Sequence, residues 1–299
     1  MEKVITASVP AHLQKHLHAG KDGEIILVSS SGIYLRFCEQ IVLVCDQDWG
    51  VLPIGIGVED FGRTVRLLRP QQGQRVRISE NCLRFRSGSI RLVPENRFRG
   101  GACHSLPQVS SIRQAAEELA ALRKERGLSM LVLPLVLGRT AETFWEQNPY
   151  CARGCQYLSK LMTALDGGDS CDIYSCVEKF LGLGPGLTPS ADDVLLGMLY
   201  VFGALPRKAP GGTQAFRECV RQLCDRCTGQ ISAAYLKAMI EGAPFERMEQ
   251  VFRGLCGEET PDIGKLTQIG SSSGSEMLLG MLIALKICGY DVSQKEELQ

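Results

Sequence analysis

The spacing of apolar residues changes once along this chain, and that change limits the folds it can adopt. From about residue 24 to 93, apolar and polar residues alternate with a period of two, as expected for half-buried strands. After Pro107 the period becomes helical, with one apolar stripe in a helix expected over 111–126. The sequence therefore predicts an α+β protein, with a β-rich domain over 1–105 and a mostly helical domain over 106–299.

The first domain contains seven short segments with strand periodicity, separated by turn residues. We expect strands over 24–29, 32–37, 41–45, 63–68, 74–79, 82–86 and 89–93. In Arg75-Val76-Arg77-Ile78 the arginines alternate with apolar residues, so one face of the sheet is charged and the other belongs to the core. This pattern favours a small antiparallel barrel or sandwich.

The second domain has helical periodicity throughout, apart from one apolar run. Further helices are expected near 142–165, 171–181, 190–204, 213–241, 244–255 and 276–289. The run 131–137 is apolar at nearly every position, and its periodicity assigns it to neither a helix nor a strand.

Charge is balanced over the whole chain but not within the first domain. Thirty-three basic residues match thirty-three acidic ones, so net charge favours neither nucleic acid nor a membrane surface. Residues 63–99, however, hold ten arginines against Glu80 and Glu95. A solvated face, a subunit interface and a nucleic-acid surface all remain open. Nucleic acid is the least favoured of these, because only Phe85 and Phe98 could stack on bases.

Composition also bears on the compartment and on the available chemistry. No stretch reaches the roughly 18–20 apolar residues of a membrane span, and thirteen scattered cysteines without a signal peptide indicate reduced thiols in a cytoplasm. Cys224 and Cys227 form a Cys-x-x-Cys, but they fall inside an expected helix, which favours burial over zinc binding. All four histidines precede residue 105, so chemistry in the second domain has no local imidazole.

A near-repeat lies inside the helical domain. Residues 188–199 align without gaps on 271–282, and both copies contain Leu-Leu-Gly-Met-Leu. Ser190 with Asp193 corresponds to Ser273 with Glu276, which is the Ser-x-x-acid spacing of a capping box at a helix start. We expect the two helices to pack through Gly197 and Gly280, which would bring the loops before them together.

These two loops carry the candidate site. Glycines free the backbone for close approach to a ligand, and helix N-termini attract anions. The acidic residues would repel a bare anion, so they indicate a bound Mg²⁺, an amide or amine donor, or simple capping. The spacing favours capping for Asp193 and Glu276 and leaves Asp192 as the freer carboxylate and the candidate metal ligand. A glycine-rich turn before a well-capped buried helix is the alternative without a ligand.

The candidate residues fall into two groups. The best catalytic candidates are Thr188, Asp192 and Asp193. The candidates for binding a substrate or anion are Gly184, Gly186, Thr188, Ser190, Ser271, Ser272, Ser273 and Glu276. Ser272 also stands in a Gly-x-Ser-x-Gly pattern, but no strand precedes it and no histidine follows it, so a hydrolase nucleophile is not favoured.

The run Gly-Leu-Gly-Pro-Gly-Leu-Thr-Pro-Ser-Ala-Asp-Asp (182–193), followed by the Gly-Ser-Ser-Ser-Gly-Ser loop, resembles the AllH family. The departure is Ala191, where that family usually has glycine. The resemblance implies a subunit of oxamate carbamoyltransferase, a multi-subunit enzyme that converts oxalurate and phosphate to oxamate and carbamoyl phosphate in purine and allantoin breakdown. The partners expected are the other subunits and a small anionic substrate or phosphate.

The absence of two motifs keeps other functions open. The Ser-Thr-Arg-Thr and His-Pro-x-Gln motifs of conventional carbamoyltransferases are absent from this sequence. The chain could therefore be a structural or regulatory partner that binds other subunits through its arginine-rich β face. A β domain that binds RNA or DNA is the third hypothesis.

Overall fold

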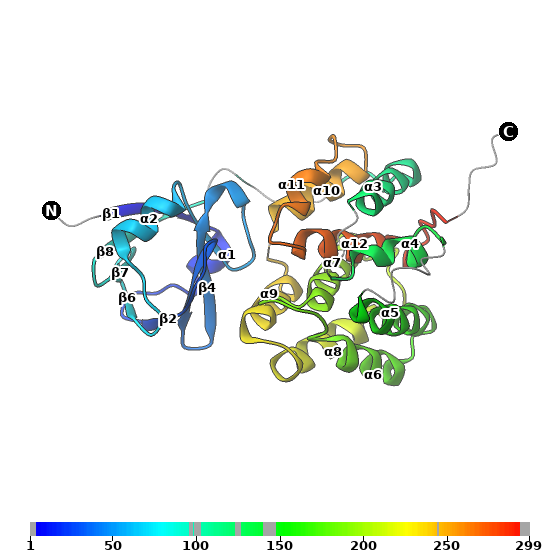
Figure 1. Cartoon of the computed structure of the whole chain (residues 1–299), viewed down its shortest axis with the longest axis horizontal. Helices are drawn as coiled ribbons and strands as arrows, with labels where there is room; N and C mark the ends of the chain where they lie inside the picture. Colours follow the sequence, from blue (N-terminus) through cyan, green and yellow to red (C-terminus); the bar gives the residue numbers. More distant parts are fainter. Residues whose placement is uncertain are drawn as a thin grey trace. The chain divides into compact units, whose positions relative to one another are not determined.

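The computed structural model describes residues 4–95, 98, 103–122, 127–139, 148–243 and 245–293. Backbone contacts divide the chain into two units, residues 1–100 with 243–247, and residues 101–242 with 248–299 (Figure 1). The first unit is a β barrel and the second is helical, which confirms the predicted α+β fold class.

The first unit is a closed barrel of eight strands. They are β1 (Val4–Val9), β2 (Asp22–Val28), β3 (Gly32–Phe37), β4 (Gln40–Asp46), β5 (Gly55–Val58), β6 (Arg75–Ser79), β7 (Cys82–Phe85) and β8 (Gly88–Pro94). Around the barrel the order is β1-β5-β4-β3-β2-β6-β7-β8. The pairs β1–β8 and β4–β5 are parallel and the others antiparallel. Closure leaves no edge strand open for pairing with another chain.

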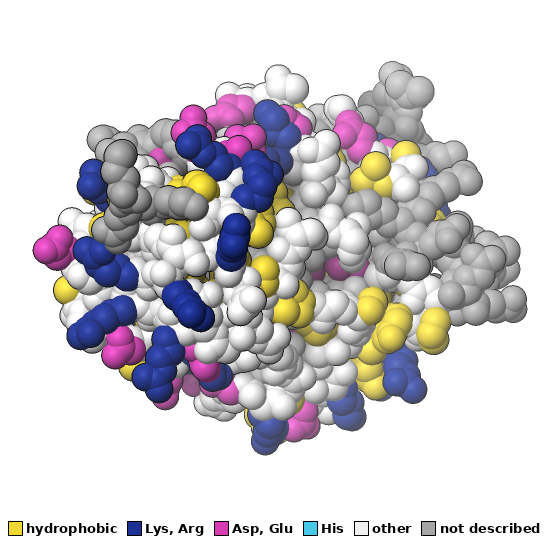
Figure 2. Space-filling model, turned by 60° about the vertical axis from the view of Figure 1, so that its left-hand side comes forward, with side chains coloured by type: hydrophobic (Ala, Val, Ile, Leu, Met, Phe, Trp, Pro, Cys, Tyr) yellow, Lys and Arg dark blue, Asp and Glu magenta, His cyan; other side chains and the backbone are white. Residues whose placement is uncertain are grey.

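Alternation along the strands separates the core from a charged surface, as the sequence predicts. In β6, Val76 and Ile78 are buried while Arg75 and Arg77 are exposed. We call the eight described, exposed arginines of the 63–99 segment the arginine-rich surface: Arg63, Arg66, Arg69, Arg75, Arg77, Arg84, Arg86 and Arg91. Figure 2 shows Lys and Arg side chains spread over this unit. Arg97 and Arg99 lie outside the described residues.

Residues 63–68 are not a strand but most of helix α2 (Phe61–Leu68). Asp60 starts this helix by accepting a hydrogen bond from the backbone N–H of Arg63 at 2.7 Å. The buried residues are Phe61, Thr64 and Leu68, a helical spacing that a search for alternation does not detect. The sequence analysis also missed β1 and β5; β5 contains two glycines, which weaken the strand signal.

The second unit is built from helices. They are α3 (Val109–Ala121), α4 (Val132–Leu135), α5 (Pro149–Gly167), α6 (Ser170–Phe180), α7 (Ser190–Ala204), α8 (Thr213–Cys227), α9 (Gln230–Ile240), α10 (Glu246–Leu255), α11 (Ile263–Thr267) and α12 (Ser273–Ile287). The first two residues of α10 belong to the first unit. Short helical turns complete the described structure: α1 (Ala11–Gln14), η1 (Gln47–Trp49) and η2 (Ser129–Leu131).

Helices α7 and α12 form the centre of this unit. They pack on each other, α7 also contacts α9, and α12 contacts α3, α4 and α11 (Figure 1). Nearly every residue of both helices is buried, and a helix that is apolar all round is typical of such a central position. Among the described residues, no helix is both long enough and apolar enough to cross a membrane.

Several helix boundaries differ from those predicted. The expected helix 213–241 is two helices, because the chain breaks at Thr228 and Gly229. Helix α3 ends at Ala121 and α5 begins at Pro149; residues 123–126 and 142–147 of the predicted helices lie outside the described residues. The apolar run 131–137 contains the last residue of η2 and the single turn α4.

Candidate functional site

The two repeated helices approach each other through glycine, as predicted. A Cβ atom on Gly280 would overlap the carbonyl oxygen of Val194 and lie 3.1 Å from Cα of Gly197. A Cβ on Gly197 would likewise overlap the carbonyl oxygen of Met277. Only residues without a side chain allow the backbones of α7 and α12 to come this close.

This packing brings the two loops before the helices together, which confirms the predicted proximity. We call residues 182–189 and 270–272 the paired loops. The hydroxyl oxygens of Thr188 and Ser273 lie 3.2 Å apart at the two helix starts. Gly184 and Gly186 have φ values of 118° and 106°, a region that side chains strongly disfavour. A Cβ on Gly184 would lie 2.8 Å from the nitrogen of Ser190, so this glycine also permits close contact with the start of α7.

Two carboxylates lie beneath the paired loops, one from each helix. Asp193 and Glu276 are both 0% exposed. Asp193 Oδ2 accepts a hydrogen bond from the Thr188 hydroxyl at 3.1 Å, and Ser273 also hydrogen-bonds to Asp193. Glu276 Oε2 accepts a hydrogen bond from the Ser272 hydroxyl at 3.2 Å.

The surroundings favour the neutral form of Asp193. Burial raises its pKa well above the ordinary value, and the neighbouring charge of Glu276 raises it further. Hydrogen bonds from Ser273 and Thr188 act in the opposite direction, because they stabilise the carboxylate. The two acids therefore form an electrostatically coupled pair at the base of the paired loops.

The predicted capping boxes are wrong. The residue before α7 is Pro189 and the residue before α12 is Ser272, and neither makes a side-chain capping bond. Each helix begins one residue earlier than a capping box requires, so Asp193 and Glu276 stand at the fourth helical position. There they turn into the interface between the helices. Glu276 does accept a backbone N–H, but from Leu128 at 2.9 Å, outside its own helix.

The prediction that Asp192 is the freer carboxylate is also wrong, whereas its role as a candidate Mg²⁺ ligand stays a prediction. Asp192 is 0% exposed, and its Oδ1 accepts the backbone N–H of Gly182 at 2.8 Å. Its Oδ2 accepts the hydroxyls of Ser232, at 2.6 Å, and Thr228. These three donors occupy the carboxylate, which ties the glycine loop to α9. Within the described residues, no group of three or more His, Cys, Asp or Glu could hold a metal ion.

Three buried oxygens at the base of the paired loops lack a hydrogen-bond partner within the described chain. They are Ser190 Oγ, Asp193 Oδ1 and Ser275 Oγ. Ser190 and Glu276 both lie against Gly127, where a Cβ would come within 3.1 Å of Ser190 Oγ and overlap the Glu276 carboxylate. Buried polar atoms without partners are uncommon in native proteins, so these three oxygens keep hydrogen-bonding capacity that the described chain does not use.

The candidate residues occupy three depths. Gly186 and Ser271 are exposed, whereas Gly184, Thr188, Ser272 and Ser273 are half-buried and Ser190 is buried. The backbone N–H groups of Gly184 and Gly186 donate to no other group in the described part of the chain. The surface of the paired loops thus offers both N–H donors and hydroxyl oxygens, with the acids below.

The sequence analysis missed the contributions of Gly127, Leu128, Thr228 and Ser232. These residues lie far in the sequence from the acids that they contact: the separation is 36 residues between Thr228 and Asp192 and 148 residues between Leu128 and Glu276. No sequence motif marks such distant residues. Cys224 and Cys227, considered for zinc, lie on α8, and all thirteen cysteines are free.

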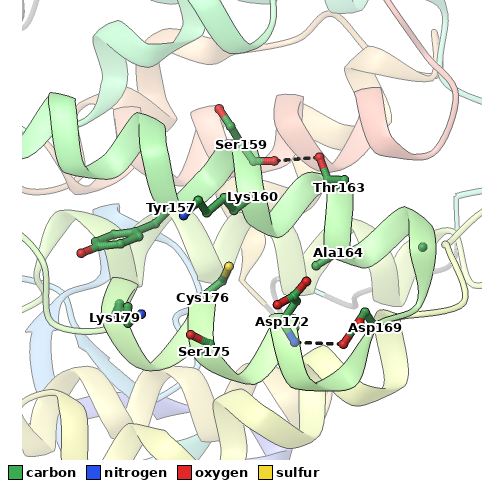
Figure 3. A pocket seen from close by; sticks show the side chains of 11 residues that line it. Tyr157, Ser159, Lys160, Thr163, Ala164, Asp169, Asp172, Ser175, Cys176 and Lys179 are labelled. Atoms are coloured by element: carbon green, nitrogen blue, oxygen red, sulfur yellow. Dashed lines mark hydrogen bonds between the residues drawn. The ribbon is translucent and has the colours of Figure 1, made fainter.

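A surface pocket of about 770 Å³ lies between α5 and α6. Lys160 and Lys179 lie on one side of it near Tyr157, and Asp169 and Asp172 on the other (Figure 3). None of the residues that line it was predicted as a site residue, so this pocket is separate from the paired loops.

Comparison with known families gives a match. The sequence model of the family described as oxamate carbamoyltransferase subunit AllH matches residues 180–285. This range contains both paired loops and both acids of the coupled pair, and it confirms the resemblance expected from the sequence for this part of the chain. No solved structure matches the chain significantly.

Proposed function

We propose, from the match to the AllH family, that this chain is a subunit of an oxamate carbamoyltransferase-like complex. Its paired loops hold the small anionic substrate or phosphate. The complex transfers a carbamoyl group between oxalurate and phosphate, with oxamate and carbamoyl phosphate as products, in purine and allantoin breakdown. A cytoplasmic location is part of the proposal, and thirteen free cysteines support it.

The observation that carries the proposal is the meeting of the two loops inside the matched range. Thr188 and Ser273, 85 residues apart in sequence, have hydroxyl oxygens 3.2 Å apart. The unpartnered N–H groups of Gly184 and Gly186 can donate to carboxylate or phosphate oxygens. Two segments that converge in this way support a binding function better than a simple turn before one helix.

The acids beneath the loops do not contradict an anionic ligand. An ionised carboxylate close to a bound anion would repel it by about 1–4 kcal/mol. Burial and Glu276 raise the pKa of Asp193, so Asp193 binds a proton at a higher pH than an ordinary aspartate. In that state Asp193 carries no negative charge.

A second candidate function is favoured by the arginine-rich surface. This surface gathers eight exposed arginines in the 63–99 segment, and a surface rich in one charge suits a partner that presents carboxylates. In this alternative the chain is a structural or regulatory partner and performs no chemistry.

Reconstitution of the complex separates the two candidates. The chain, as wild type or Thr188→Val, is mixed with its partner subunits, and assembly and carbamoyl phosphate formation are both measured. We expect Thr188→Val to assemble normally and to lose at least about 10-fold in activity, as for removal of one hydrogen bond in a desolvated site. Thr163→Val, at an exposed position of α5, is the control. Full activity of the assembled Thr188→Val complex would favour the non-catalytic partner.

A further inference from the structure

We propose that the pocket between α5 and α6 is a second binding site, whose ligand is a short peptide with free termini. The pocket has a volume of about 770 Å³, which is within the usual range for small-molecule sites. All the residues that line it precede residue 180, so it lies outside both the paired loops and the range that the AllH model matches. The inference is therefore independent of the proposed function.

The pocket follows from the way in which α5 and α6 are joined. Helix α5 ends at Gly167 and α6 begins at Ser170, and the two helices pack on each other (Figure 1). A connection this short makes neighbouring helices antiparallel. The lining residues extend from this connection to Tyr157 on α5 and Lys179 on α6, so the pocket follows the groove between the two helices.

Charges of opposite sign occupy opposite ends of this pocket. Lys160 and Lys179 lie at the end far from the connection, and Asp169 and Asp172 lie at the end beside it (Figure 3). Lys179 follows Asp172 by seven residues on α6, which corresponds to about 10 Å along the helix axis. Within the described part of the chain, neither lysine forms an ion pair, and neither does Asp172. Both ends therefore keep their charge available to a ligand.

One sulfur atom between the two ends shows that these charges face the same hollow. Cys176 lines the pocket and is 6% exposed. Burial raises the pKa of its thiol and Asp172 raises it further, whereas Lys160 and Lys179 lower it. Both lysines and one aspartate thus act on a single buried atom, so the charges converge on the groove.

Hydroxyl groups line the stretch between the charged ends. Ser159 and Thr163 come from α5, and Ser175 comes from α6. Thr163 donates its hydroxyl proton to the backbone carbonyl of Ser159 at 3.2 Å, so its oxygen keeps acceptor capacity. A peptide backbone offers both N–H donors and C=O acceptors to such hydroxyls.

The charge arrangement determines the chemistry of the ligand. A carboxylate suits the lysine end and a protonated amine suits the aspartate end. A ligand with one sign of charge would be attracted at one end and repelled at the other. An extended peptide advances by about 3.3–3.6 Å per residue, so the termini of a tripeptide are about 10 Å apart. A single amino acid carries both charges on one carbon atom and cannot reach both ends.

The test is a titration of the full chain with triglycine at pH 7, followed by the backbone NMR resonances of Gly167 and Ser175. Three matched probes separate the contributions. N-acetyl-triglycine lacks the amine, triglycine amide lacks the carboxylate, and glycine has both charges without the length. We expect triglycine to shift these resonances to saturation. Each matched probe should bind at least about 3-fold more weakly, because it loses a partly exposed ion pair.

Variants assign the charges to the two ends. Lys160→Gln combined with Lys179→Gln should weaken triglycine binding at least about 5-fold, and should remove the difference between triglycine and its amide. Both positions are exposed, so the variant should fold. Lys208→Gln, at an exposed lysine outside the pocket, is the control and should leave the affinity unchanged.

Three outcomes would overturn the inference and leave the proposed function standing. The first is equal binding of triglycine and its amide by the wild type. The second is a set of resonance shifts confined to Gly184 and Gly186 of the paired loops. The third is the lack of any saturable shift up to about 10 mM triglycine.

Discussion

Adding one methyl group at the contact of α7 and α12 tests the geometry on which the site depends. In Gly280→Ala, the new Cβ would overlap the Val194 carbonyl oxygen, and it would lie 2.8 Å from the carbonyl carbon and 3.1 Å from Cα of Gly197. All three atoms are backbone, so no side chain can rotate away. To restore ordinary contacts of about 3.5 Å, the helices must move apart by up to about 1.5 Å.

The expected change in the free energy of unfolding follows from two opposing effects. Overpacking a core costs about 1–3 kcal/mol, and a clash with backbone lies at the upper end of that range. Alanine is favoured over glycine in a helix by about 1 kcal/mol. We therefore expect Gly280→Ala to destabilise the protein by about 2 kcal/mol.

The same helix pair offers a matched control. Gly203 lies in the last turn of α7, and a Cβ there would meet nothing within 4 Å. Gly203→Ala should therefore stabilise the protein by about 0.5–1 kcal/mol.

Urea denaturation followed by circular dichroism measures both variants. The two substitutions should shift the midpoint in opposite directions. Gly280→Ala should also weaken oxamate binding, because separation of the helices breaks the contact between Thr188 and Ser273. If Gly280→Ala were as stable as Gly203→Ala, the close packing of α7 on α12 would be refuted.

Three further predictions concern the acids and the cysteines. Asp192→Asn should lose about 1–3 kcal/mol of stability because it disturbs three buried hydrogen bonds; a fully stable but inactive variant would instead indicate a direct role in binding or catalysis. In the folded state Asp193 keeps its proton above pH 3.8, because its pKa is raised above this ordinary value. The unfolded state loses the same proton near pH 3.8. The free energy of unfolding therefore falls as the pH rises from 3.8 through the raised pKa of Asp193. Asp193→Asn has no such proton to lose. The melting temperature of the variant minus that of the wild type should therefore increase from pH 5 to pH 8, and a decrease of this difference would contradict the raised pKa. Reductant and chelator should leave the melting temperature unchanged, because all thirteen cysteines are free and the described residues form no group for a metal; stoichiometric zinc by metal analysis would count against this.

Strands β6 and β7 could be predicted because they bury alternate residues. In β6 and β7 the arginines face outward between buried apolar residues, and that pattern is visible in the sequence. Helix α2 was misassigned because its burial follows Phe61, Thr64 and Leu68, with an exposed arginine in between. Strand β5 was missed because Gly55 and Gly57 have no side chain to show a period.

The meeting of the two loops was predictable, but the hydrogen bonds of their residues were not. The repeat of Leu-Leu-Gly-Met-Leu placed Gly197 against Gly280 and the two loops together. The Ser-x-x-acid spacing, however, is identical whether the helix begins after the serine or at it. In α7, Pro189 precedes the first helical residue, and this one-residue difference turns Asp193 inward. The partners of Asp192 come from α9 and the turn before it, and no local pattern indicates such long-range contacts.

The burial of Asp193 explains how a site without histidine can respond to pH. No histidine follows His104, and hydroxyl groups do not titrate near neutral pH. Asp193 differs because burial and Glu276 raise its pKa. It therefore changes its charge at a pH closer to neutral than an ordinary aspartate does. Its Oδ2 is linked to the surface by Thr188. As pH rises and Asp193 loses its proton, a negative charge develops beneath the paired loops. The affinity of the proposed anion site must then fall, even while phosphate itself becomes more negative.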